Sequence, residues 1–177
     1  LLLISGTGIL NAQTYQWQFG KQAGGQSGPA TSFFSYQSDE LIRDIAVDSD
    51  NDTYYLATIW AQEQNLNGSP VTSYSKRDLF LFSTDCQGNV RWSRTIGGSG
   101  SDENAWNIEI DNNGGIYILA SILSSSQNGD PNAVPIHLGD NTTLPLYNYT
   151  DLNTPDEGFK SSFLLKYNTA NGNFVWS

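Results

Sequence analysis

The sequence contains an internal repeat. Residues 38–59 and 101–122 align without a gap at an offset of 63, and nine of the 22 aligned positions are identical. The identities include a Ser-Asp-Glu start, an Asp in the middle and a Tyr-x-Leu-Ala stretch near the end. Repeats of this kind are typical of architectures in which similar units stack on their neighbours. The chain is therefore expected to hold at least two copies of one unit.

A second pair of segments extends the unit. Residues 78–93 and 162–177 both have an apolar run, a Gly-Asn turn and a Trp-Ser pair. Together the two matches divide the better-defined unit into four segments, which are 41–48, 53–60, 78–85 and 89–96. All four are rich in β-branched and aromatic residues and are bounded by turn residues, as strands are. No window shows the period of an amphipathic helix.

The apolar pattern predicts how these strands are covered. The second and third segments are nearly continuous apolar runs, which is typical of strands that are buried on both faces. The fourth alternates between apolar and polar residues, as a half-exposed outer strand does. Four-stranded antiparallel sheets stacked through both faces are the blades of a β-propeller. We therefore expect an all-β fold built from such blades, as a fragment of a larger propeller.

One stretch resembles a known family. Residues 92–121, WSRTIGGSGSDENAWNIEIDNNGGIYILAS, resemble the bacterial SBBP repeat, which is named after seven-bladed β-propellers. The resemblance implies a propeller repeat in a large exported protein of Bacteroidetes-like bacteria, and many such proteins carry a C-terminal sorting domain for type IX secretion. Together with the duplicated strands, it leads us to expect a non-catalytic secreted or cell-surface module for binding, adhesion or scaffolding. The departure from the family lies in long inserts, because the tryptophans at 17, 92 and 176 are 75 and 84 positions apart.

The order of the segments predicts the organisation of the chain. Residues 1–12 are apolar and end in a small residue, as the remnant of a cleaved signal peptide does, and the alternative is an ordinary first strand. Residues 13–177 are then a partial propeller, found secreted or at the cell surface. Within it we expect a closing outer strand at 14–20, a blade at 39–97 and an incomplete blade at 101–177. Further blades of the same natural chain are expected as its partners.

Charge and composition exclude several functions. The formal net charge is −10, so the phosphate backbone of a nucleic acid would be repelled. No stretch is apolar and long enough to span a bilayer. The single cysteine, Cys86, cannot form a disulfide within the chain. The core must therefore supply the stability.

Long inserts indicate where binding would occur. Inserts at 61–77 and 124–160 join second to third strands, and 21–37 joins one unit to the next, so all three belong at one end of the sheets. Loops of this length are usually functional or disordered. Aromatic residues there can stack on sugar rings or hold the inserts against the sheets. The ligand-binding candidates, for an unknown protein or glycan, are Trp60, Tyr74, Tyr147 and Tyr149.

A metal site is suggested by one turn. Asp48, Asp50 and Asp52 have the spacing that begins a calcium loop, but no closing carboxylate follows. The corresponding turn of the second unit keeps only Asp111. The alternative is a hairpin turn held by aspartate side chains. No cofactor other than calcium is indicated.

Catalytic patterns are weak in this sequence. The Ser-Asp-Glu triplets at 38–40 and 101–103 recur in each unit, whereas one ring needs one active site, so we expect them to hydrogen-bond between blades. The only histidine, His137, lies in an insert and is expected to be a surface residue. We therefore expect no enzyme. The alternative is a polysaccharide-active propeller whose candidate acids are Asp130, Asp140, Asp151, Asp156 and Glu157.

Overall fold

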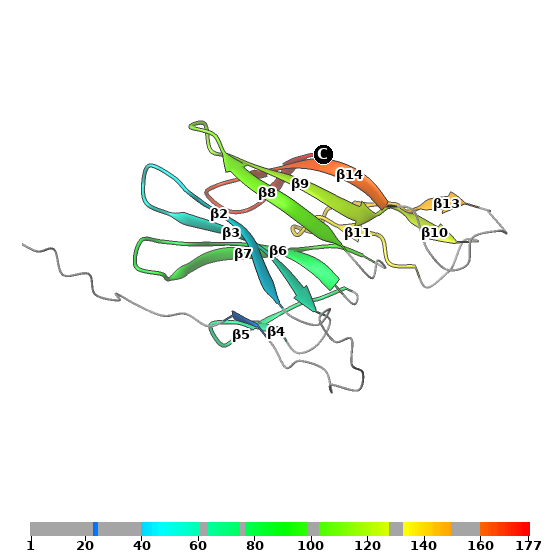
Figure 1. The fold of residues 1–177 in the computed structure, drawn as a ribbon, viewed down its shortest axis with the longest axis horizontal. Helices are drawn as coiled ribbons and strands as arrows, with labels where there is room; N and C mark the ends of the chain where they lie inside the picture. The colour runs from blue at the N-terminus through cyan, green and yellow to red at the C-terminus, as the bar shows by residue number, and fades with distance from the viewer. Residues whose placement is uncertain are drawn as a thin grey trace, which may run out of the picture.

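Two four-stranded antiparallel sheets form the body of the structure, a computed structural model (Figure 1). It describes residues 23–24, 40–60, 64–74, 77–98, 103–127, 133–149 and 160–177. Every regular element in these ranges is a β-strand, which confirms the expected all-β fold of blade-like sheets. The same ranges contain no helix with the length and apolar character needed to cross a membrane.

The first sheet has the strand order β2–β3–β6–β7. Its strands are β2 (Leu41–Val47), β3 (Thr53–Trp60), β6 (Arg77–Thr84) and β7 (Val90–Ile96). The second sheet has the equivalent order β8–β9–β14–β15. Its strands are β8 (Asn104–Ile110), β9 (Gly115–Leu123), β14 (Lys160–Asn168) and β15 (Phe174–Trp176). The first strand of each sheet carries a bulge at the equivalent place, Arg43 in β2 and Trp106 in β8.

The third strands of the two sheets, β6 and β14, do not correspond in the way that the gapless match of 78–93 to 162–177 aligns them. Leu56 of β3 lies opposite Leu81, and the equivalent Leu119 of β9 lies opposite Leu164. Leu81 therefore corresponds to Leu164, whereas matching 78–93 to 162–177 residue for residue pairs it with 165. The two apolar runs are therefore offset by one position from the gapless alignment, because the β14–β15 turn is one residue longer than the β6–β7 turn. A slip of one residue exchanges the two faces of a strand.

Each sheet has two different faces. The leucine face carries Leu56 and Leu81 in the first sheet, and Leu119 and Leu164 in the second. On the opposite side lies the isoleucine face, which includes Ile45 in the first sheet and its equivalent, Ile108, in the second. The leucine face of the first sheet packs on the isoleucine face of the second, so the sheets stack head to tail.

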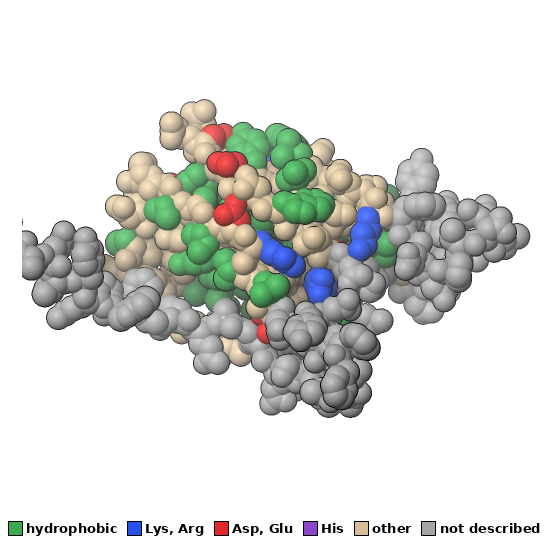
Figure 2. All heavy atoms as spheres, viewed as in Figure 1, with side chains coloured by type: hydrophobic (Ala, Val, Ile, Leu, Met, Phe, Trp, Pro, Cys, Tyr) green, Lys and Arg blue, Asp and Glu red, His purple; other side chains and the backbone are tan. Residues whose placement is uncertain are grey.

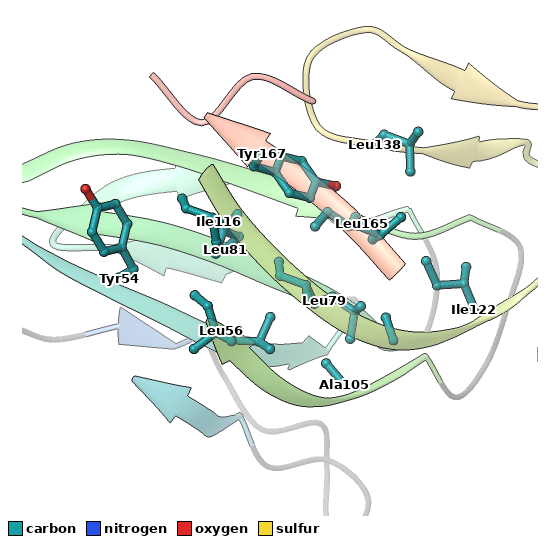
Figure 3. Close-up of a cluster of buried hydrophobic side chains, with 14 of the residues drawn as sticks. Tyr54, Leu56, Leu79, Leu81, Ala105, Ile116, Ile122, Leu138, Leu165 and Tyr167 are labelled. Carbon is teal, nitrogen blue, oxygen red and sulfur yellow. The ribbon is translucent and has the colours of Figure 1, made fainter. Parts of the chain in front are cut away.

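The main core lies between these two faces (Figure 3). Leu56, Leu81, Ile116 and Ile118 are fully buried there. Burying a side chain of this size stabilises the fold by about 1.5–3 kcal/mol. The contact between the two sheets is thus the larger of the two apolar clusters among the described residues.

A second core lies on the isoleucine face of the first sheet. Here the hairpin of β4 (Gln64–Leu66) and β5 (Ser69–Val71) covers part of the sheet, and β1 (Ala23–Gly24) pairs with β4. The cluster consists of Ala57, Ile59, Leu66, Phe80 and Phe82. The hairpin turn places Asn67 and Gly68 at φ of 51° and 84°, as a two-residue turn with positive φ at both positions requires.

The second insert also has strands of its own. β10 (Ser125–Gln127) pairs in parallel with β13 (Tyr147–Tyr149), and β11 (Ile136–His137) pairs with β12 (Thr143–Leu144). The short turns lie at the left of Figure 1, while β10 and β13 extend at the right. The expected signal remnant at 1–12 and closing strand at 14–20 lie outside the described residues.

Candidate functional site

Trp92 joins the two sheets at their outer strands. Its Nε1 donates a hydrogen bond of 3.0 Å to the carbonyl of Thr169, in the β14–β15 turn. The indole ring lies against Gly172, where any Cβ would collide with the ring and where φ is 68°. Nearby, Arg94 donates from Nε to the Gly172 carbonyl at 3.0 Å. A glycine in this turn is therefore required twice, for its backbone conformation and for the close approach of the ring.

A carboxylate joins the sheets at their inner strands. Oδ2 of Asp44 accepts a hydrogen bond of 3.0 Å from the backbone N–H of Ile108, next to the bulge in β8. The bulge interrupts the ladder at this point, and Asp44 supplies the missing acceptor. A bond of this kind was expected from the Ser-Asp-Glu triplets, which do not include Asp44, so that expectation stays a prediction. Of these, Glu103 is fully buried, while 38–39 and 101–102 lie outside the described residues.

The turn aspartates have the same contacts in both sheets. Oδ1 of Asp48 accepts hydrogen bonds from the N–H groups of Asp50 and Asp52, at 2.9 and 3.0 Å, and Oδ2 accepts one from the Tyr54 hydroxyl at 2.7 Å. Burial and the bond to Asp48 raise the pKa of Tyr54. Asp52 pairs with Arg91 at 2.7 Å. These contacts agree with a turn held by aspartate.

Asp111 reproduces this arrangement in the second sheet. Its Oδ1 accepts from the N–H groups of Asn113 and Gly115, both at 2.8 Å, and its Oδ2 accepts from the Tyr117 hydroxyl at 2.8 Å. Within the ranges described, no cluster of three or more His, Cys, Asp or Glu residues is placed to hold a metal ion. Calcium binding by Asp48, Asp50 and Asp52 stays a prediction.

Acid should destabilise the fold through Asp111 and Asp140. The Gly115 N–H, together with Tyr117 and Asn113, lowers the pKa of Asp111 below 3.8. Burial raises the pKa of Asp140, but hydrogen bonds from Thr142 and the Phe174 N–H outweigh it and the net shift is downward. Both groups hold fewer protons folded than unfolded, so their stabilisation is present above the unfolded value and is lost as pH falls through the folded one.

We expect the urea midpoint to fall between about pH 7 and about pH 3, and to fall less in Asp111→Asn, where that carboxylate no longer titrates. Asp50→Asn is the matched control, because Asp50 is an exposed aspartate in the equivalent turn of the first sheet. Equal acid sensitivity in Asp111→Asn and the wild type would contradict the assigned role of Asp111.

Two inserts meet at Tyr74 and His137. Their rings stack with centroids 4.0 Å apart and an interplanar angle of 5°. The N–H of Tyr74 donates to Oδ2 of the fully buried Asp78 at 2.6 Å, and burial, followed by the charge of Asp78, raises the pKa of Tyr74. The backbone of His137 exchanges hydrogen bonds of 2.7 and 3.1 Å with Gly97. His137 is therefore partly buried between the inserts, and its prediction as a plain surface residue missed this contact.

The other aromatic candidates are placed differently. Trp60 lies at the end of β3 with the Arg77 guanidinium 5.9 Å from its ring centroid. Tyr147 and Tyr149 belong to β13, but their side chains lie outside the description. The structure thus brings together Tyr74 and His137. The sequence did not indicate this pair, because neither insert contains a pattern that predicts a contact with the other.

The acids of the enzyme alternative are only partly described. Oδ2 of Asp140 accepts a hydrogen bond of 2.9 Å from the Phe174 N–H, and Oδ1 accepts one of 3.1 Å from the Thr142 N–H. Asp140 therefore holds the second insert against the start of β15. The four remaining candidates lie outside the described residues, namely Asp130, Asp151, Asp156 and Glu157.

An apolar surface remains open on the second sheet. On its leucine face Leu119 is 46%, Leu164 50% and Trp176 42% exposed, whereas the equivalents in the first sheet are almost fully buried. Lys166 lies 4.9 Å from the centroid of the Tyr117 ring on the same face. Figure 2 shows hydrophobic side chains gathered over β8 and β9 at its upper edge. This surface was not predicted from the sequence, although the repeat was the signal that could have revealed it.

Comparison with known proteins leaves the structure as the main guide to function. No protein-family model matches the chain, and no curated protein matches it. The two stacked sheets and the exposed leucine face are therefore the features on which a functional interpretation rests.

Proposed function

We propose that this chain is part of an exported, non-catalytic β-propeller of the SBBP type that serves as a secreted or cell-surface binding, adhesion or scaffold module. One observation carries the proposal: two equivalent sheets stack head to tail, through an interface that the repeated residues build. In this chain the repeated residues form the contact between the sheets, as expected of a scaffold that carries surface loops.

The polar groups support the same interpretation. Asp44, Asp48, Asp111 and Asp140 each accept a hydrogen bond from a backbone N–H, so these carboxylates support turns and contacts within the fold. The insert end offers the binding surface of the module. There, Tyr74 and His137 form a flat aromatic pair beside buried Asp78, which suits a protein or glycan partner.

Binding without turnover is the expected experimental result. The whole chain would be titrated with a panel of soluble polysaccharides by calorimetry, and the same mixtures assayed for new reducing ends. Tyr74→Ala should weaken binding by about tenfold or more, because it removes one ring of the stacked pair. Trp106→Ala is the matched control, an aromatic side chain 51% exposed in β8. Turnover that Asp140→Asn abolishes would refute the proposal and favour the polysaccharide-active enzyme.

Export has its own test. Expressed in a bacterium with an outer membrane, the protein should appear at the surface or in the medium, with a new N-terminus at residue 13. Retention of the uncleaved chain inside the cell would contradict this part of the proposal.

A further inference from the structure

The hairpin β4–β5 occupies a place that a sheet occupies elsewhere in the molecule. It covers Ala57, Ile59, Phe80 and Phe82 on the isoleucine face of the first sheet. By strand register, these correspond to residues of the second sheet whose isoleucine face is covered by the first sheet. The corresponding residues are Ala120, Ile122, Phe163 and Leu165. The same positions are thus covered once by a sheet and once by a hairpin.

The hairpin covers this face less completely than a sheet does. Ile42 and Ile45 of β2 are 50% and 51% exposed, while their equivalents Ala105 and Ile108 are 3% exposed. Between the hairpin and the inner strands lies an apolar pocket, with Ile42, Phe80 and Val71 among its lining residues. The hairpin is therefore a small and imperfect cover that leaves the inner half of the face in water.

The attachment of the hairpin is also slight. Leu66 is its only fully inserted apolar side chain among the described residues, at 5% exposure, and Val71 is partly buried. A polar tie follows β5, where the Thr95 hydroxyl donates to the Thr72 carbonyl at 2.6 Å. The Ser73 hydroxyl and the Tyr74 N–H, further along the chain, both donate to Oδ2 of Asp78 at 2.6 Å. The apolar contact of the hairpin itself, through Leu66 and Val71, still covers less area than a sheet-to-sheet interface does.

The surface that would replace the hairpin exists on the same chain. The leucine face of the second sheet is exposed, and its equivalent in the first sheet packs on an isoleucine face. Trp176 corresponds to Trp92, and Gly88, at φ of 77°, corresponds to the Gly172 that receives the Trp92 ring. Gly88 is already buried within one chain, so the exposed side chains of Leu119 and Leu164 carry the docking rather than this tryptophan contact.

We propose that the β4–β5 hairpin is a removable cap, and that when it leaves the first sheet, the leucine face of a second copy of this chain docks there head to tail. The interface within the chain is the template for the one between copies. Such contacts are heterologous, so they extend or close into a ring rather than stop at a symmetric dimer. The net charge of −10 opposes association, and salt should strengthen it by screening.

Two substitutions test the two faces one at a time. Leu66→Asp places a charge in the apolar cluster and should release the hairpin. Leu164→Arg places a charge at the centre of the exposed leucine face and should prevent that face from docking. By sedimentation velocity, the wild type and the double variant should each be monomeric, whereas Leu66→Asp alone should associate and lose its monomer peak. A mixture of wild type and double variant should give a one-to-one heterodimer, because each supplies the face that the other lacks.

Controls distinguish docking from non-specific aggregation. Gly68→Val releases the hairpin by straining its turn without adding a charge, and should also associate. Thr143→Arg, on the exposed strand β12, should not suppress association when added to Leu66→Asp. Far-ultraviolet circular dichroism confirms that each variant is folded.

The proposal is overturned if both folded hairpin variants stay monomeric, if Leu66→Asp associates equally with and without Leu164→Arg, or if the mixture forms no heterodimer. It does not rest on the proposed binding role, because a chain that fails to bind polysaccharide could still associate in this way. Conversely, loss of association would leave the Tyr74 binding test unchanged.

Discussion

Trp92→Ala is expected to lower the free energy of unfolding by about 3–5 kcal/mol, the usual cost of removing a buried aromatic side chain from a core. Trp92 is 8% exposed, packs on Gly172 and holds the β14–β15 turn through a hydrogen bond to Thr169. Its loss opens a cavity between the sheets and leaves the Thr169 carbonyl without this donor. Domains of this size are marginally stable, so the variant should lose a large share of its total stability.

The matched control for this variant is Trp176→Ala. Trp176 occupies the equivalent position of the second sheet but is 42% exposed, so its removal should cost about 1 kcal/mol or less. Urea denaturation followed by circular dichroism measures both variants. Equal losses for the two tryptophans would show that the environment of Trp92 does not decide its contribution, and that the stacking interface is assigned wrongly.

The strands of the main sheets were predictable because their pattern is local. β-branched and aromatic runs bounded by Asp, Asn and Gly fixed β2, β3, β6 and β7 closely. The turns were equally accessible, since Asp48 and Asp111 accept their hydrogen bonds from residues two to six positions away. The repeat then predicted the strands of the second sheet from those of the first.

The faces of the third strands were not predictable in the same way. The choice between 164 and 165 as the equivalent of Leu81 depends on the length of the β14–β15 turn, and both residues are leucines. With period-two alternation, nothing local distinguishes the two registers. The correct one emerges only from pairing with β9, where Leu164 lies opposite Leu119.

The site was the least predictable part, because its contacts join distant segments. The contact between Tyr74 and His137 depends on how two inserts pack, and no repeat relates those inserts. Exposed aromatics were sought in the inserts, whereas the exposed apolar patch lies on the sheet itself, at Leu119 and Leu164. Whether a sheet face is exposed depends on whether another element packs on it. The alternation of residues within a strand does not reveal this.

Leu138→Ala is expected to destabilise the fold by about 2–5 kcal/mol, which would be an unusual result for a residue in a long surface insert. Leu138 and Ile136 are 0% and 1% exposed and belong to the core between the sheets. The backbone of His137, between them, forms a bridge with Gly97 at the end of β7. This part of the insert therefore stabilises the stacked sheets directly.

Two measurements separate that role from a local one. Thr143→Ala, an exposed change in the same insert, should alter stability by about 0.5 kcal/mol or less. Hydrogen exchange at the amides of Gly97 and His137 should, in the wild type, require the same opening free energy as amides in β9 and β14, because the insert is part of the global unit. If Leu138→Ala speeds exchange only at Gly97 and His137, with the urea midpoint unchanged, the insert is a separable loop. In that case the two sheets alone make the core, and the aromatic pair of Tyr74 and His137 sits on a surface that can move independently of them.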